Sequence, residues 1–215
     1  AREELVTAIS GNLCRCTGYG PIIAAGLASC DAAGQLDHLT YAAQQPTSTE
    51  TPSQQADIGY RIARSEAELG QWLQQDSAAG IISSQSEPRT AVKLIAGATD
   101  AWVAVNQEAQ EHANIIDISR IESLRVISQE QQMLNIGACV SHEALLEFFT
   151  TPPNRSAAVE ELLRRFGSPQ IRHAGTIGGN LCGGSPIADW SPLLLALDAR
   201  VTLKSATAAR ILPLS

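Results

Sequence analysis

The sequence predicts a mixed α+β chain with two unequal parts: a short helical part, followed by a larger part in which strands and helices alternate. In several segments, apolar residues recur every three to four positions, which is the period of an amphipathic helix. Elsewhere, short apolar runs end in glycine or polar turns, as short strands do. Residues 41–57 are rich in Gln, Ser, Thr and Pro without an apolar period, and this composition predicts a linker between the two parts.

The first part, residues 1–40, is expected to form two helices. Apolar residues recur every four positions near its start and predict a helix over residues 3–13. A Gly-Tyr-Gly-Pro turn follows, and its proline is well placed to open a second helix over residues 22–33. Two cysteines fall near the bend between these helices.

The larger part, residues 58–215, opens with a capping box from Ser65 to Glu68, which predicts a helix to about Gln75. A long glycine-rich loop is expected from Gly167 to Asp189. Apolar runs predict strands at residues 92–96, 115–118, 126–128, 133–137, 199–204 and 211–214. Helices are expected at residues 141–149 and 157–166, and from about residue 192.

Composition excludes several classes of protein. With 44% hydrophobic and 17% charged residues among 215, most of the chain is expected to fold. The net charge of -7 gives no basic field for a phosphate backbone or an anionic lipid surface, so neither nucleic acid nor membrane is expected as a partner. Apolar runs stop short of the roughly 18 residues that a membrane helix needs. The expected location is the cytoplasm.

The spacing of Cys14 and Cys16 is the first chemical signal. Two cysteines one residue apart do not easily form a disulfide with each other, because its Cα atoms are roughly 5.5 Å apart in a specific geometry. Both can face one metal centre, and an iron-sulfur cluster takes four thiolates, of which these two would be half. Two thiols without function remain an alternative for an isolated Cys-x-Cys.

Two glycine segments are the second signal. Residues 93–100, Lys-Leu-Ile-Ala-Gly-Ala-Thr-Asp, lead from a strand through glycine into a helix, where free amides favour a pyrophosphate. Residues 174–180, Ala-Gly-Thr-Ile-Gly-Gly-Asn, are expected to form a loop of exposed amides suited to an anionic cofactor. The second segment is not a Rossmann fingerprint, because its spacing differs, no apolar strand leads directly into it and no helix is expected directly after it. Ordinary turns and caps remain an alternative for each.

These motifs together resemble the xanthine dehydrogenase (molybdenum hydroxylase) family. Residues 12–19, Asn-Leu-Cys-Arg-Cys-Thr-Gly-Tyr, resemble the closing half of its second 2Fe-2S domain. The two glycine segments resemble the two FAD-binding segments of its flavin domain, in the same order. The resemblance, from about Leu5 to Leu203, implies that residues 1–40 are the C-terminal half of an all-helical 2Fe-2S domain. Residues 58–215 would be a C-terminally incomplete α+β FAD-binding domain of the vanillyl-alcohol-oxidase/PCMH type.

The resemblance also implies a ligand set. Cys14 and Cys16 would be two of four cluster ligands, and the family's other two come from an upstream Cys-Gly-x-Cys that this chain lacks. The residues expected to bind FAD are Lys93, Leu94, Ile95, Ala96, Gly97, Ala98, Thr99, Asp100, Phe166, Ala174, Thr176, Gly178, Gly179, Asn180 and Asp189.

The implied function is electron transfer within a hetero-oligomer. Electrons would pass from a molybdenum centre on a molybdopterin-binding partner chain, through 2Fe-2S clusters, to FAD and on to NAD during purine oxidation. No catalytic base or nucleophile is expected in this chain, since the cofactors carry the redox chemistry. Asn180 followed by Ser-Pro-Ile-x-Asp at residues 185–189 favours the xanthine branch of the family over the carbon monoxide branch. A related aldehyde or carbon monoxide hydroxylase remains an alternative.

Both ends of the sequence suggest a fragment. The chain starts with Ala1 in an uncapped helical pattern, and its last expected strand pair is barely complete. A non-catalytic cofactor-binding fragment is therefore a further alternative.

Overall fold

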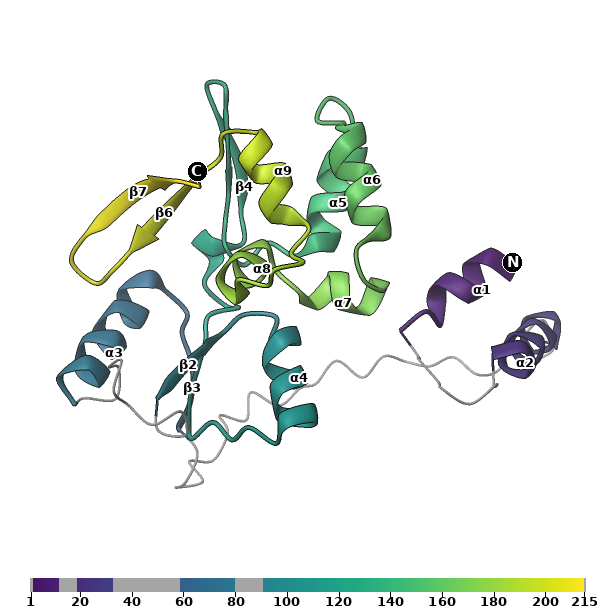
Figure 1. Cartoon of the computed structure of the whole chain (residues 1–215), viewed down its shortest axis with the longest axis horizontal. Helices are drawn as coiled ribbons and strands as arrows, with labels where there is room; N and C mark the ends of the chain where they lie inside the picture. Colours follow the sequence, from purple (N-terminus) through teal and green to yellow (C-terminus); the bar gives the residue numbers. More distant parts are fainter. Residues whose placement is uncertain (1, 12–18, 33–58, 80–90, 215) are drawn as a thin grey trace. The chain divides into compact units, whose positions relative to one another are not determined.

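The computed structural model describes residues 2–11, 19–32, 59–79 and 91–214 (Figure 1). The chain divides into two compact units. The first comprises residues 1–55 with 168–170, and the second comprises residues 56–167 with 171–215. The predicted linker at residues 41–57 and the cysteines at the predicted bend lie outside the described residues.

In the first unit, the two predicted helices are present with shifted bounds. Helix α1 spans Arg2–Ala8 and α2 spans Tyr19–Ala32. They contact each other where Leu5 lies so close to Gly26 that an added Cβ would come within 2.7 Å of it. The expectation that the first helix continues to residue 13 is wrong. Ser10 donates its hydroxyl hydrogen to the carbonyl of Thr7, and serine and glycine favour a turn over a further helical turn here.

The second unit begins with a parallel sheet. Strands β1 (Gly59–Ile62), β2 (Val92–Ile95) and β3 (Asn114–Asp117) are arranged in the order β1-β3-β2. The connection from β1 to β2 and the connection from β2 to β3 run in opposite directions across the sheet. Both are expected to be right-handed, so the helices that they contain lie on opposite faces of the sheet. Figure 1 shows this arrangement, with α3 (Glu66–Ala78) and α4 (Thr99–Glu108) on either side of the strands.

The predicted capping box starts α3. The Ser65 hydroxyl accepts a hydrogen bond from the Glu68 amide at 3.1 Å. The Glu68 carboxylate reaches back to the amide of Arg64, one residue before the usual partner. The helix continues three residues beyond the predicted end at Gln75. The helix packs on a small buried core of Ala63, Ile116 and Ile121. The residues that pack against this core are Leu69, Trp72 and Leu73 from the helix, and Val92, Ile118 and Leu124 from other segments.

The rest of the unit is largely helical. A hairpin of β4 (Ile127–Glu130) and β5 (Met133–Ile136) follows a short 3₁₀ turn, η2 (Glu122–Leu124). The main core is formed by α5 (His142–Thr150), α6 (Ala157–Arg165), α8 (Ile177–Gly183) and α9 (Trp190–Ala196). A second hairpin, β6 (Arg200–Lys204) with β7 (Ala209–Pro213), ends the described chain. Strands β2 to β7 and helices α5 and α6 thus lie close to the predicted ranges, whereas β1 is not predicted.

The predicted glycine-rich loop at residues 167–189 is wrong. Two helices occupy most of it, α7 (Pro169–Ala174) and α8, and α9 starts at Trp190 rather than near residue 192. Thr176 caps α8 by accepting from the Gly179 amide. Gly178 lies directly against Ala138, whose carbonyl oxygen would be 2.6 Å from an added Cβ. The glycines here permit close helix packing rather than loop flexibility.

Among the described residues, no helix is long and apolar enough to cross a membrane.

Candidate functional site

The two glycine segments meet in the structure. A Cβ added at Gly97 would lie 1.7 Å from the carbonyl oxygen of Ala174 and 3.1 Å from the amide nitrogen of Gly175. The turn between β2 and α4 is therefore in backbone contact with the junction of α7 and α8. No side chain fits between them, so glycine is required at this position. Packing brings together two segments that are far apart in the sequence.

The N-terminus of α4 is open to an acceptor. Its N-cap residue, Ala98, has φ 55° and ψ 11°, in the left-handed region, and no side chain caps the helix. Left-handed backbone costs about 1 to 2 kcal/mol in a residue other than glycine, and such positions concentrate at functional sites. The first amides of an uncapped helix carry donors and a partial positive charge, which favour an anion. Thr99 and Asp100 are helical residues here and do not cap.

The N-terminus of α8 differs, because its amides already donate within the protein. Ile177 donates to the carbonyl of Val140 and Gly178 to that of Ala138. Gly179 donates to the Thr176 hydroxyl, and Asn180 donates to the Thr176 carbonyl. The expected loop of exposed amides at residues 174–180 is therefore wrong. Open backbone donors belong to the first glycine segment, whereas the second one holds the junction together.

A cavity of about 310 Å³ opens at this junction. It lies where β2 and β3 end, and ligand sites in parallel α/β sheets prefer this carboxyl edge. Of the expected FAD contacts, Ala96, Gly97, Ala174 and Thr176 line it. Its other lining residues lie outside the two glycine segments, and they are Ser119, Arg120, Arg125, Cys139, Val140, Ser141, Ala144 and His173.

The Cys139 thiol in this cavity is held in its neutral form. Burial raises its pKa to about 11, and the negative charge of Asp117 acts in the same direction. Its sulfur lies 3.5 Å from the carbonyl oxygen of Ile118, which it contacts as a weak donor. A thiol with such a pKa is not a nucleophile at neutral pH.

Asn180 carries an unpaired acceptor in α8, the helix that follows the second glycine turn. Within the described chain, two buried side-chain atoms have no hydrogen-bond partner, namely Asn180 Oδ1 and His112 Nε2. Buried polar atoms nearly always have a partner, so an orphan next to a candidate site favours a missing ligand group. Asn180 is one of the expected FAD contacts, and its unpaired oxygen fits a ligand that carries hydroxyl or amide donors.

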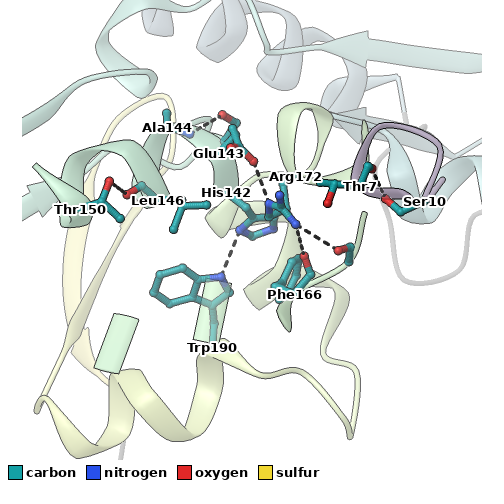
Figure 2. A network of polar contacts seen from close by, with 12 residues as sticks. Thr7, Ser10, His142, Glu143, Ala144, Leu146, Thr150, Phe166, Arg172 and Trp190 are labelled. Atoms are coloured by element: carbon teal, nitrogen blue, oxygen red, sulfur yellow. Dashed lines mark hydrogen bonds and ion pairs between the residues drawn. The ribbon is translucent and has the colours of Figure 1, made fainter. Parts of the chain in front are cut away.

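His142, Phe166 and Trp190 form an aromatic cluster (Figure 2). The Trp190 indole donates to His142 Nδ1 at 3.1 Å, and these two residues are only 1% and 2% exposed. The His142 ring also contacts Phe166, with 4.3 Å between the ring centroids. The His142 amide donates to the carbonyl of Gly175 at 3.0 Å. Since the indole N–H is only a donor, His142 is neutral with its proton on Nε2.

Arg172 fixes the same region from α7. Its guanidinium is bonded to Glu143 at 2.7 Å and to the carbonyls of Phe166 and Gly167, as Figure 2 shows for Glu143 and Phe166. Arg172 is buried, and a buried arginine with several acceptors fixes the geometry of the segments that supply them. Phe166, an expected FAD contact, is held here between His142 and Arg172.

Lowering the pH is expected to destabilise the fold through His142. Burial lowers the pKa of His142 from its ordinary 6.5 to about 4, so the unfolded chain takes up this proton at a higher pH than the folded chain. The free energy of unfolding should therefore fall as the pH drops from 6.5 to 4, by about 3 kcal/mol from this residue. Urea unfolding across this range measures it. His142→Asn should flatten the dependence, whereas the control, exposed His173→Asn, should not. An unchanged slope in His142→Asn would contradict the assignment.

Four further expected contacts, Lys93, Leu94, Ile95 and Asp189, do not line this cavity. Lys93 and Leu94 are exposed strand residues, and Ile95 is half-buried at the end of β2. Asp189 lines a different, larger cavity of about 640 Å³, together with the loop at residues 185–188 and residues from α6 and α9. No signal in the sequence marked Ser119, Arg120 and Arg125 as residues of a binding site, because they become part of the cavity only through packing.

The predicted metal ligands are not among the residues that the structure describes. No group of three or more His, Cys, Asp or Glu residues in the described part of the chain is arranged to hold a metal ion. Cys14 and Cys16 are outside that part, so the ligand assignment stays a prediction.

A parallel sheet with an uncapped helix after its glycine turn, joined to a helical region that carries a second glycine segment, has the architecture of a nucleotide-cofactor-binding domain. Comparison with protein families identifies which one. Residues 59–215 match the family described as the FAD binding domain in molybdopterin dehydrogenase, and the chain belongs to this family.

Individual relatives agree with the family. The chain is 34% identical over 122 residues to the nicotinate dehydrogenase FAD-subunit of Eubacterium barkeri, a match covering 57% of this chain and 41% of that protein. It is 26% identical over 241 residues to the xanthine dehydrogenase/oxidase of mouse, covering 94% of this chain and 18% of that protein. The carbon monoxide dehydrogenase structure from Hydrogenophaga pseudoflava superposes with a TM-score of 0.61 at 26% identity, over 74% of this chain and 50% of that one. The chain thus spans half or less of these relatives' lengths.

Proposed function

We propose that residues 58–215 bind FAD and form the electron-transfer flavin domain of a molybdenum hydroxylase. The observation that carries the proposal is the backbone contact of Gly97 with Ala174, which joins the two glycine segments at one cavity. Family membership supports FAD as the ligand. When bound, FAD would supply the redox chemistry, and the residues of this chain would hold it in place and limit its access to water.

The residues around the junction suit the parts of this cofactor. The open amides of α4 and the polar cavity suit the diphosphate, and the unpaired Asn180 Oδ1 suits a hydroxyl donor. All the residues expected to bind FAD from the sequence are retained as proposed contacts. Phe166 is one of them, held in place by His142 and Arg172. Asp189 is another, at the larger cavity.

We further infer that residues 1–40 are the C-terminal half of a helical 2Fe-2S domain, joined to the flavin domain by residues 41–57. The match with the mouse protein supports this inference. It covers 94% of this chain, so it extends beyond residues 59–215 into the first part. Cys14 and Cys16 are the proposed ligands from this chain. The other two ligands would come from outside it.

Xanthine or hypoxanthine is the substrate proposed for the complete enzyme, with NAD as acceptor and a molybdopterin-binding chain as partner. The chain would then be part of the small subunit of a xanthine dehydrogenase, which carries the iron-sulfur clusters and the flavin. The match to the mouse protein over nearly the whole chain supports this choice. A second candidate is a relative that acts on nicotinate or carbon monoxide, which the higher identity to the nicotinate enzyme and the superposition on the carbon monoxide enzyme favour.

Asn180→Ala tests the proposed flavin site. The variant removes an acceptor that has no partner among the described residues, so the free energy of unfolding without FAD should be unchanged or slightly higher. FAD affinity, measured by flavin fluorescence titration, should fall about tenfold because one hydrogen bond to the cofactor is lost. Failure of the unaltered protein to bind FAD would overturn the proposed function. Lower stability with unchanged FAD affinity would show that Asn180 is structural.

A further inference from the structure

Two arginines line the cavity at the junction, and neither belongs to the glycine segments. Arg120 follows β3 by three residues, and Arg125 directly follows η2. Arg120 therefore comes from the carboxyl end of β3, and Arg125 comes from the segment between η2 and β4. The two arginine side chains thus line the cavity together with residues of the two glycine segments.

The backbone that carries these arginines is well anchored. On the side of Arg120, the Asp117 carboxylate accepts from the Ser119 amide at 2.8 Å, and the next residue, Ile121, is 1% exposed in the core. On the side of Arg125, the carbonyl of Leu124 accepts from the Cys139 amide at 2.7 Å. Both guanidinium groups thus extend from fixed points, which reduces the conformational entropy lost when a ligand binds.

The charged residues that line the cavity are arginines, and the carboxylates of Asp117 and Glu122, which act on Cys139 and Arg125, lie outside its lining. Among the described residues that line it, there are two arginines and no carboxylate, although the whole chain has a net charge of -7. Arg120 forms no ion pair within the described part of the chain. Arg125 lies 3.4 Å from Glu122, a pair whose side chains are 49% and 83% exposed, and such a contact contributes little. Ser119, Ser141 and Thr176 add hydroxyl groups. This combination suits phosphate oxygens.

We propose that Arg120 and Arg125 bind the diphosphate of FAD, together with the open amides of α4. This inference rests on the proposed function. Arginine presents several N–H donors in a planar fork that matches phosphate geometry, and a diphosphate offers two charged groups for two such forks. The two arginines would supply locally the positive charge that the protein as a whole lacks.

The test compares FAD and riboflavin, because riboflavin carries the flavin ring without phosphate. Affinities are measured by fluorescence titration of flavin-free protein for Arg120→Gln, Arg125→Gln and the double variant. Each single substitution should weaken FAD binding about tenfold to a hundredfold and leave riboflavin binding unchanged. Inorganic pyrophosphate should compete with FAD in the unaltered protein and lose this effect in the double variant. Arg120→Lys should recover part of the affinity, since it keeps the charge but not the fork.

Arg164→Gln is the matched control. Arg164 is also an exposed arginine in a surface pair, 2.9 Å from Glu160, but it lies outside the cavity. Its substitution should leave both affinities unchanged. Equal FAD affinities in the unaltered protein and the double variant would overturn the inference while leaving the proposed function intact. Equal losses for FAD and riboflavin would also overturn it, since the arginines would then not act through phosphate. Absence of FAD binding in the unaltered protein would overturn the proposed function itself.

Discussion

Gly97→Ala is expected to destabilise the protein by about 3 kcal/mol and to weaken FAD binding by more than tenfold. The new methyl group would lie 1.7 Å from the carbonyl oxygen of Ala174, and the obstructing atoms are backbone that no rotamer change can move. Added atoms in tight packing cost about 1 to 3 kcal/mol, and contact with backbone places this case at the upper end. The two segments must separate, which opens the proposed site. Urea unfolding and flavin titration measure the two effects.

Gly183→Ala provides the control for this substitution. Gly183 lies in α8, near the same site, but an added Cβ would meet only Asp100 Oδ2 at an ordinary contact distance of 3.7 Å. Alanine is also a better helix former than glycine, so stability should be equal or slightly higher. Should Gly97→Ala behave like Gly183→Ala in both measurements, the close junction between the glycine segments would be disproved.

Trp190→Ala should cost about 3 to 5 kcal/mol of stability, among the largest effects expected from a single substitution in this chain. Trp190 is 1% exposed in the main core, and its removal leaves a cavity among Val140, Leu145, Leu163 and their neighbours. The substitution also leaves His142 Nδ1 without its donor. Because His142 holds Gly175 through its amide, FAD affinity should fall as well.

Trp190→Phe and Trp102→Ala separate the contributions to this effect. Phenylalanine keeps most of the apolar volume but not the indole N–H, so it should cost less than alanine, about 1 to 3 kcal/mol. Trp102 is 60% exposed on α4, and its removal should change the free energy of unfolding by less than about 0.5 kcal/mol. Similar losses for Trp190→Ala and Trp102→Ala would contradict the assignment of Trp190 to the core.

Local patterns were sufficient to predict much of the fold. The capping box at Ser65 begins α3, and Ser141 caps α5, because capping depends on residues within one turn of each other. The six predicted strands lie within a few residues of β2 to β7 for the same reason, whereas β1 is not predicted. The prediction of a loop at residues 167–189 is wrong because clustered glycines also occur where helices pack closely. In the structure Gly178 allows α8 to approach Ala138, a contact that depends on a distant segment.

For the candidate site, the sequence by itself determined that two glycine segments matter, since glycine after a strand and a cluster of glycines are local signals of close backbone approach. Only the tertiary structure decided how they are used. It places Gly97 against Ala174, uses the amides of α8 internally, and leaves those of α4 without a side-chain cap. It also brings Arg120 and Arg125 to the cavity. Local hydrogen bonding follows from neighbouring residues, whereas these contacts join distant segments and exist only once the core has packed.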